Sequence, residues 1–309
     1  MRRSEKTNVY AIASKSIEKT ERFEINQIYD NYDAILADEN VEAVYIPLPN
    51  SLHHDMVIQS LQAGKHVLVE KPATISYEEM QDIADVVHET GQYFLEGFMY
   101  QHHAQHDKVQ ELLASIGEIQ HVKSQFSFIC EDEGNIRLNP SLGGGALHDV
   151  GCYSLHAITQ IIGFKPVAIS MVSNTLAEEG VDRTSHCTLF DQNGKTATFT
   201  CSLELPFNNF YEIIGEKGII KVTDSFRPDR SKDGCGHIEL QSLEGDVIES
   251  YAIEDDQYLR QIEFFEDDVE KATAPTANIK QSLEMAYYIE QAYVSAKNNG
   301  QLVHLDEID

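Results

Sequence analysis

Apolar and polar positions alternate along the first hundred residues in a way that predicts a parallel sheet. Short apolar runs predict strands at residues 9–13, 41–46, 66–69 and 93–95. Helix-like spacing, with cap and stop residues, predicts helices at residues 17–23, 51–63 and 76–89. Strands that alternate with helices are typical of right-handed β-α-β crossovers. Residues 1–98 are therefore expected to form an α/β domain.

The pattern changes after residue 98. Consecutive strands with turn signals such as Asn193-Gly194 occupy residues 167–249, after a first strand at 120–129. Helices are expected at residues 107–115, 146–162, 256–271 and 279–298. Residues 99–309 are therefore predicted to form an α+β domain with a largely antiparallel open sheet. Its last helices are expected to pack back on the first domain.

Charge and hydropathy exclude two classes of partner. The chain has 23 basic and 51 acidic residues, a net charge of -28, which argues against nucleic acid and against an anionic membrane surface. No apolar run is long enough for a membrane span, and no apolar segment follows the basic start as in a signal peptide. We expect a cytoplasmic protein.

Cysteine and histidine spacing gives no metal site. The five cysteines contain no C-x-x-C pair, which fits a reducing compartment and suggests neither zinc nor a disulfide framework. His102 and His106 have the i, i+4 spacing that suits zinc on a helix, but no third ligand lies at a sensible spacing. We predict no bound metal.

Lys71 is the first candidate for chemistry. It ends the apolar strand 66–69 and precedes Pro72, where a cis peptide bond would suit a sharp turn. Ligands of open parallel sheets bind at the carboxyl ends of the strands, so Lys71 is expected in a binding cleft. The alternative is a surface lysine after an edge strand.

Asp149 and Tyr153 are the second candidates. They lie four residues apart on a predicted helix and would share one face, with His156 three residues further on. A neighbouring Lys71 ammonium would lower the pKa of the Tyr153 phenol by favouring the phenolate, which would suit acid–base catalysis. The alternative is a helix whose Asp149 caps its start and whose Tyr153 packs in the core.

Four segments in this order resemble a known family: 44–53, 63–72, 96–100 and 143–153. On them the chain is identified as a member of the Gfo/Idh/MocA oxidoreductases. Tyr153 resembles the branch of glucose-fructose oxidoreductase, dihydrodiol dehydrogenase and NADP-xylose dehydrogenase more than the inositol branch. The resemblance implies a Rossmann-type dinucleotide-binding domain, followed by a substrate domain whose sheet pairs subunits into a homodimer or a higher homo-oligomer.

The resemblance also implies roles for single residues. Lys71, Tyr153 and Asp149 would be catalytic. The nicotinamide end of the cofactor would be lined by Pro47, Pro49, Asn50, His53, Glu70 and Lys71. The substrate would be contacted by Tyr100 and His156. His53 also follows a turn at a strand end, where a cofactor edge is expected.

One family feature is missing from this sequence. Relatives open with a strand, a G-x-G-x-x-G loop and a helix, and here the chain starts at what resembles the second strand. Because the first strand is central in the usual order, its loss would leave a gap in the sheet. A misplaced or artificial start, a shortened protein without cofactor binding, and a strand supplied by a neighbouring chain are the alternatives. The first is preferred because the other motifs are intact.

The expected cofactor follows from the end of the strand 9–13. NAD sites place an acidic residue there, whereas this chain has Ser14 and Lys15, whose hydroxyl and cation suit a 2′-phosphate. We expect NADP, with NAD as the alternative. The predicted activity is interconversion of a hydroxyl and a carbonyl on a sugar, polyol or cyclic diol. The alternative is a non-catalytic sugar-binding or regulatory descendant.

Overall fold

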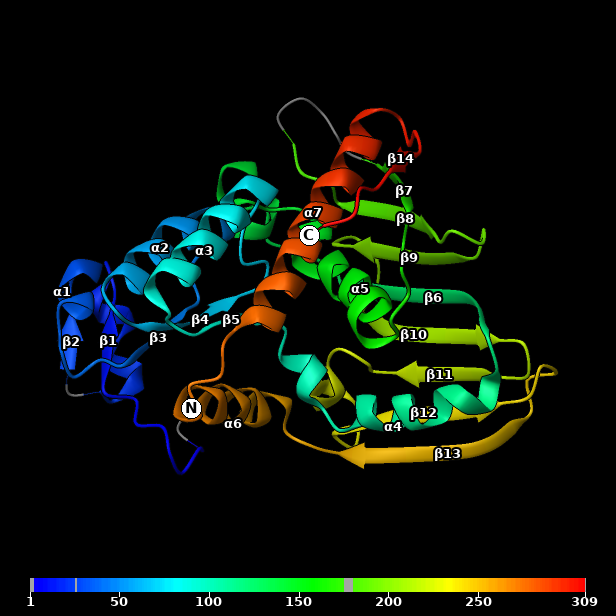
Figure 1. Ribbon diagram of the computed structural model, residues 1–309, viewed down its shortest axis with the longest axis horizontal. Coiled ribbons are helices and arrows are strands. Elements are labelled where there is room, and N and C mark those ends of the chain that lie inside the picture. Colours follow the sequence, from blue (N-terminus) through cyan, green and yellow to red (C-terminus); the bar gives the residue numbers. More distant parts are fainter. Residues whose placement is uncertain (1–2, 26, 175–179, 309) are drawn as a thin grey trace.

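The computed structural model describes residues 3–25, 27–174 and 180–308. Figure 1 shows the two domains side by side, with helix α7 (Thr276–Lys297) running between them. Among the described residues, no helix combines the length and the apolar character that crossing a membrane requires.

The first domain contains two parallel sheets. One pairs β1 (Ala11–Ala13) with β2 (Gln27–Tyr29), and the other has the order β3 (Ala43–Ile46), β4 (His66–Glu70) and β5 (Phe94–Gly97). No ladder among the described residues joins the two sheets, so the predicted gap is present. The centre of β4 and all of β5 are buried, as is usual for parallel strands.

The first domain has three α-helices among its described residues. They are α1 (Tyr32–Leu36), α2 (His53–Gln62) and α3 (Tyr77–Thr90). Of these, α3 follows the cap signals of the sequence, whereas α2 begins at His53 without a side-chain cap. The Ser76 side chain accepts a hydrogen bond from the Glu79 amide at the start of α3, and Gly91 ends the helix with a φ of 68°.

One prediction for the first forty residues was wrong, and two elements there were missed. The helix expected at 17–23 is instead a pair of 3-10 turns, Ile17–Lys19 and Glu21–Phe23. Strand β2 and helix α1 were not predicted. Strand β2 has only three residues and no buried one, so no apolar run marks it.

The second domain is built on a nine-stranded sheet. Its order is β13-β12-β11-β10-β6-β9-β8-β7-β14. The strands are β6 (Ile119–Ser127), β7 (Ala168–Ser173), β8 (Thr184–Phe190), β9 (Thr196–Ser202), β10 (Asn208–Gly215), β11 (Ile219–Thr223), β12 (Cys235–Gln241), β13 (Val247–Glu254) and β14 (Val303–His304). Only the β6–β9 pair among them is parallel, so the expectation of a largely antiparallel sheet is confirmed.

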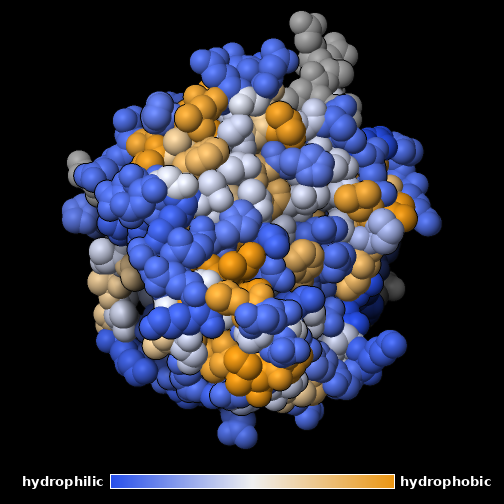
Figure 2. Space-filling view, turned by 90° about the vertical axis from the view of Figure 1, so that its right-hand side faces the viewer, coloured by the Kyte–Doolittle hydropathy of each residue, from blue (hydrophilic) through white to orange (hydrophobic). Residues whose placement is uncertain are grey.

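One face of this sheet carries the main core. Alternate residues of β6 and β10, such as Val122, Phe126 and Tyr211, pack beneath the helices α4 (Gln105–Leu113) and α5 (Cys152–His156). Burying each large apolar side chain stabilises the fold by about 1.5–3 kcal/mol. At the end of this domain away from the first, the surface is mostly hydrophilic with separate small apolar patches (Figure 2), consistent with the high net charge.

The helix predicted at 146–162 is not a regular α-helix. Single π-helical turns, Leu147–Gly151 and Ala157–Ile161, flank α5 on both sides. Such wide turns are rare and change which side chains share a face. Asp149 lies in the first π turn and Tyr153 in α5.

The last two helices contact both domains. Helix α7 places Leu283 and Ala286 against the first-domain core, and Met285 and Ile289 in the second-domain core. Helix α6 (Gln257–Glu270) adds Phe265 beside Tyr93 at the edge of the first sheet. Helix α7 therefore contributes apolar side chains to the cores of both domains and links them.

Candidate active site

Lys71 lies at the carboxyl end of β4, as the parallel-sheet argument predicts. The Lys71-Pro72 peptide bond is cis, as expected. The Lys71 ammonium donates to the Asp149 backbone oxygen at 2.5 Å and lies 3.3 Å from Asp149 Oδ1. Only 11% of its side chain is exposed, so the surface-lysine alternative is wrong.

Asp149 is held between two cations. Besides Lys71, the Arg137 guanidinium donates from Nε to Asp149 Oδ2 at 2.7 Å. The Asp149 side chain is 15% exposed, whereas Arg137 is 41% exposed and lies at the outer side of the pair. Arg137 was not among the predicted site residues. The sequence could have identified Arg137, because it is the one basic residue of the segment 131–140.

Tyr153 packs against Lys71, but the expected effect on its pKa is wrong. The Lys71 ammonium lies 5.0 Å from the centroid of the Tyr153 ring, over its face. The hydroxyl donates to the Met99 thioether at 3.4 Å, a weak acceptor. Burial, followed by the charge of Glu70, raises the pKa of Tyr153 well above its ordinary value. The phenol is therefore neutral near pH 7.

Tyr100 and His156 lie behind Tyr153 and not on an open surface. Both are 0% exposed, and the Tyr100 hydroxyl is 2.6 Å from His156 Nδ1. The Tyr100 ring is tilted against the Tyr153 ring, with centroids 5.6 Å apart. Burial lowers the pKa of His156 to about 3. This position corrects the expectation that the two residues line the pocket: they support the Tyr153 ring from within the core.

His53 is likewise a structural residue. Its ring is 0% exposed, and its nitrogens lie 2.8 Å from the backbone oxygens of Pro72 and Leu48. These contacts tie the start of α2 to the turn after Lys71. The prediction that His53 lines the cofactor cleft is therefore corrected: its role here is to hold the cleft wall.

The turn after β3 does reach the edge of the site. Pro47 is exposed, and Pro49 and Asn50 are partly exposed. Asn50 donates from its side chain to the Gly143 backbone oxygen at 2.8 Å, which joins this turn to the glycine-rich loop. At the end of β4, Glu70 accepts a 2.5 Å hydrogen bond from the Tyr45 hydroxyl.

Ser14 and Lys15 lie at the end of β1, on the other first-domain sheet. The Ser14 hydroxyl donates to the Ser16 backbone oxygen at 3.1 Å, and the Lys15 ammonium lies 5.6 Å from the centroid of the Tyr32 ring. Lys15 is exposed and Ser14 is partly exposed. They remain available to an anionic ligand, and their role in cofactor binding stays a prediction.

Asp182 fixes the start of the helical segment that carries Asp149 and Tyr153. Its carboxylate accepts from the Leu147 amide at 2.8 Å, from Ser185 at 2.8 Å and from the Tyr293 hydroxyl at 2.7 Å. Gly145, with a φ of 123°, leaves no room for a Cβ beside Asp182. The glycine-rich loop is therefore clamped between β8 and α7.

Replacing Asp182 by alanine is expected to destabilise the fold by about 2–4 kcal/mol, because three buried donors lose their acceptor. Urea unfolding followed by circular dichroism measures the change. Glu244→Ala, in an exposed turn, is the control and should leave the midpoint unchanged. Equal midpoints for Asp182→Ala and the natural chain would contradict the clamp.

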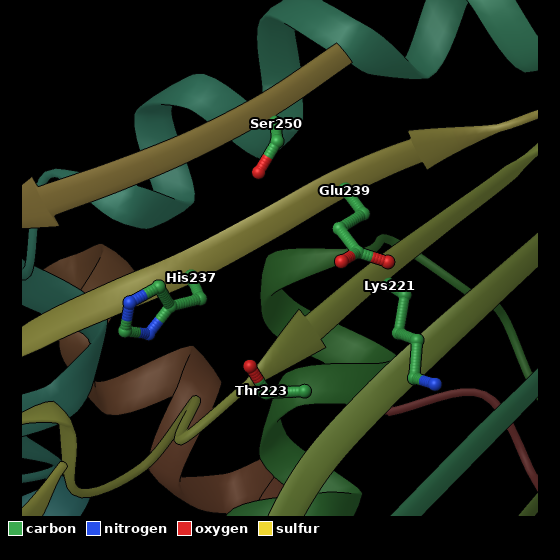
Figure 3. A pocket seen from close by; sticks show the side chains of 5 residues that line it. All are labelled: Lys221, Thr223, His237, Glu239 and Ser250. Atoms are coloured by element: carbon green, nitrogen blue, oxygen red, sulfur yellow. The ribbon is translucent and has the colours of Figure 1, made fainter. Parts of the chain in front are cut away.

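A separate hollow of about 270 Å³ lies on the open face of the large sheet (Figure 3). Its lining residues come from β11, β12 and β13: Lys221, Thr223, His237, Glu239 and Ser250. The alternating residues Val222 and Ile238 point into the core on the other face. This hollow is therefore on the opposite side of the sheet from α5 and Tyr153.

The fold and these residues match known proteins. Residues 1–98 match the family described as "Oxidoreductase family, NAD-binding Rossmann fold", and residues 106–221 match the "GFO/IDH/MocA C-terminal domain". D-xylose 1-dehydrogenase (NADP(+)) 2 of Haloferax volcanii is 34% identical over 281 residues, which cover 90% of this chain and 85% of that protein. The chain belongs to the Gfo/Idh/MocA oxidoreductase family.

Other members of this Gfo/Idh/MocA family are also similar. The crystal structure of a 3-ketoreductase from Actinomadura kijaniata, in complex with NADP and TDP-benzene, has a TM-score of 0.87 and 30% identity. That match covers 94% of this chain and 90% of the other. Trans-1,2-dihydrobenzene-1,2-diol dehydrogenase of Xenopus tropicalis is 26% identical over 228 residues, 71% of this chain and 68% of that protein. The family is one of NAD(P)-dependent oxidoreductases of sugars and cyclic diols.

The described residues fit the nicotinamide end of such a cofactor. The carboxyl edge of β3 and β4 offers an amide at Asn50, a carboxylate at Glu70 and an ammonium at Lys71, with part of this edge open to solvent. The hydroxyl and ammonium of Ser14 and Lys15 fit a 2′-phosphate. No G-x-G-x-x-G loop occurs in the 309 residues, so none of them is assigned to the pyrophosphate.

Proposed function

We propose that this Gfo/Idh/MocA protein is an NADP-dependent oxidoreductase that interconverts a hydroxyl and a carbonyl on a sugar, polyol or cyclic diol. The observation that carries the proposal is the packing of the Lys71 ammonium, held by Asp149, against the ring of Tyr153 at the carboxyl end of a parallel strand. The carboxyl edge of an open parallel sheet is where such folds bind their ligands, which supports the proposal.

Tyr153 is the proposed proton donor in the direction of carbonyl reduction. Because its phenol is neutral, its proton is available when a carbonyl oxygen gains negative charge. The substrate oxygen would replace the Met99 thioether as hydrogen-bond partner. In the direction of hydroxyl oxidation Tyr153 would first release its proton to solvent, and the phenolate so formed would accept the proton of the substrate hydroxyl.

Lys71 is proposed to stabilise the developing oxyanion. Burial, the largest single effect, would lower the pKa of Lys71, but the nearby Asp149, Cys152 and Glu70 groups together outweigh it and the pKa is raised. Lys71 therefore stays cationic. A preorganised cation in a largely buried site stabilises charge that forms in the transition state. Asp149, held from the other side by Arg137, fixes the direction of the ammonium.

The cofactor, when bound, supplies or accepts the hydride at the substrate carbon. The chain is proposed to hold its nicotinamide end with Pro47, Pro49, Asn50, Glu70 and Lys71, and its 2′-phosphate with Ser14 and Lys15. The substrate class rests on the relatives, whose names include a D-xylose dehydrogenase, a 3-ketoreductase and a dihydrodiol dehydrogenase. A homodimer through the open face of the large sheet and a cytoplasmic location stay predictions.

The test is cofactor binding followed by turnover. NADPH binding is measured by fluorescence titration, and a panel of aldoses, ketosugars and cyclic diols is then screened for NADPH formation or loss at 340 nm. Binding with turnover of at least one compound supports the proposal. Absence of both would favour the alternative of a non-catalytic sugar-binding descendant, which sugar-dependent thermal stabilisation would then identify.

Lys15→Ala is expected to weaken NADPH binding about three- to tenfold, because one exposed ion pair to a phosphate contributes on the order of 1 kcal/mol. NADH binding should change much less, since NADH lacks the 2′-phosphate. Fluorescence titration with both cofactors measures the difference. Lys123→Ala, on the second-domain sheet, is the matched control. Equal weakening of NADPH and NADH would show that Lys15 does not contact the 2′-phosphate.

A further inference from the structure

A buried acid lies directly behind the Lys71 turn and has no part in the chemistry above. Glu96, on β5, is 3% exposed. Its Oε1 accepts a hydrogen bond from the Ala73 amide at 2.8 Å, and its Oε2 accepts one from the Ser282 hydroxyl at 2.7 Å. One carboxylate therefore joins the turn that follows Lys71 to helix α7, which packs against both domains.

The surroundings of Glu96 leave it few charged neighbours. Among the described residues, the Lys71 ammonium is the ionisable group that acts on Glu96, and the Glu96 charge in turn acts on the buried Cys152 thiol. The residues that line a small hollow together with Glu96 carry no charge, and they include Pro72, Thr74, Ser282, Met285 and Ile289. Burial raises the pKa of Glu96 to about 7, against the opposing effects of Ser282, Ala73 and Lys71.

We propose that Glu96 is a positioning residue that holds the Lys71 turn through the Ala73 amide, and that gain or loss of its proton changes this hold. The ionised carboxylate accepts strong hydrogen bonds from both partners and adds a negative charge near Lys71. The protonated acid accepts more weakly, and its own proton needs an acceptor. Ala73 is two residues from Lys71, so a change at its amide is transmitted to the turn that aims the ammonium.

The expected effect of Glu96 ionisation on turnover rests on the proposed function of Lys71, whereas its expected effect on the turn does not. The effect on the turn itself is measured without cofactor. In protein labelled with 15N-alanine, the Ala73 amide resonance, assigned with an Ala73→Ser variant, is followed by NMR between pH 5 and pH 9. We expect the amide proton to move downfield as Glu96 ionises, with a midpoint near pH 7.

Two variants make the titration specific. In Glu96→Gln the midpoint should disappear, because the amide side chain keeps the shape but has no proton to lose. In Ser282→Ala the midpoint should move to higher pH, because a hydrogen bond that favours the ionised form is removed. A merely structural role of Glu96 predicts no midpoint in any of the three proteins, and that result would overturn the proposal.

Thermal unfolding gives a second reading. A carboxyl group whose folded pKa is raised above its ordinary value contributes most stability at low pH and loses it as the pH rises through the folded pKa. The melting temperature of the natural chain minus that of Glu96→Gln should therefore fall between pH 5 and pH 7 and level off above pH 8. A difference that does not change with pH would contradict ionisation of Glu96.

Turnover supplies the functional arm once a substrate is known. We expect kcat of the natural chain to rise with pH around an apparent pKa near 7, and kcat of Ser282→Ala to rise at higher pH. In Glu96→Gln this rise of kcat with pH should be absent. KM for NADPH should change little in all three proteins. An Ala73 titration that leaves kcat unaffected would overturn the link to Lys71. Failure to find any substrate would count against the proposed function, while the NMR result still decides whether Glu96 controls the turn.

Discussion

Replacing Lys71 by methionine is expected to lower kcat about 10²- to 10⁴-fold while the protein stays folded. Methionine has a similar length, so the buried space beside the Tyr153 ring stays filled. Asp149 keeps its ion pair with Arg137. The loss of folding stability that follows from removing the Lys71 ammonium beside the Asp149 carboxylate should therefore be small. What is lost is the positive charge that is proposed to stabilise the developing oxyanion.

The measurement is steady-state turnover with the best substrate of the panel, together with NADPH titration and circular dichroism. Lys123→Met is the matched control, because Lys123 pairs with Glu212 on the exposed face of the large sheet and is half exposed. The control should keep kcat and the fold. Turnover by Lys71→Met within a few-fold of the natural chain would remove Lys71 from the mechanism.

Tyr153→Phe is the second large effect, and its two consequences have opposite signs. Loss of the phenol proton is expected to lower kcat about 10²- to 10⁴-fold. Stability should not fall, because within the described part of the chain the hydroxyl has only the weakly accepting Met99 thioether as hydrogen-bond partner, so its burial is poorly compensated. We expect the free energy of unfolding to stay equal or to rise by up to about 1 kcal/mol.

Urea unfolding and turnover of the same preparation measure both consequences. Tyr211→Phe is the control for removal of a buried hydroxyl: the Tyr211 hydroxyl lies 2.9 Å from His106 Nδ1 in the core. It should lose stability and keep activity. A Tyr153→Phe protein that is destabilised and fully active would show that Tyr153 is only a core residue.

Local patterns in the sequence were sufficient for most of the fold. The apolar runs 66–69 and 93–95 mark the buried parallel strands β4 and β5, because such strands are covered on both faces and so contain few polar residues. The Ser76 cap and the Gly91 stop act on neighbouring backbone groups and therefore need no tertiary information. The short elements β2 and α1 escaped prediction because they carry too few buried residues to produce a pattern.

The sequence by itself determined which residues are proposed to supply the chemistry: Lys71 at a strand end, and Asp149 and Tyr153 on one helical segment. The tertiary structure decided how they are arranged. Lys71 lies over the ring of Tyr153, and burial, followed by the charge of Glu70, raises the pKa of the phenol, which stays protonated. Arg137 and Glu96 join the site only through contacts between segments far apart in the chain. Burial and long-range contacts depend on packing of the whole chain, and local spacing does not encode them.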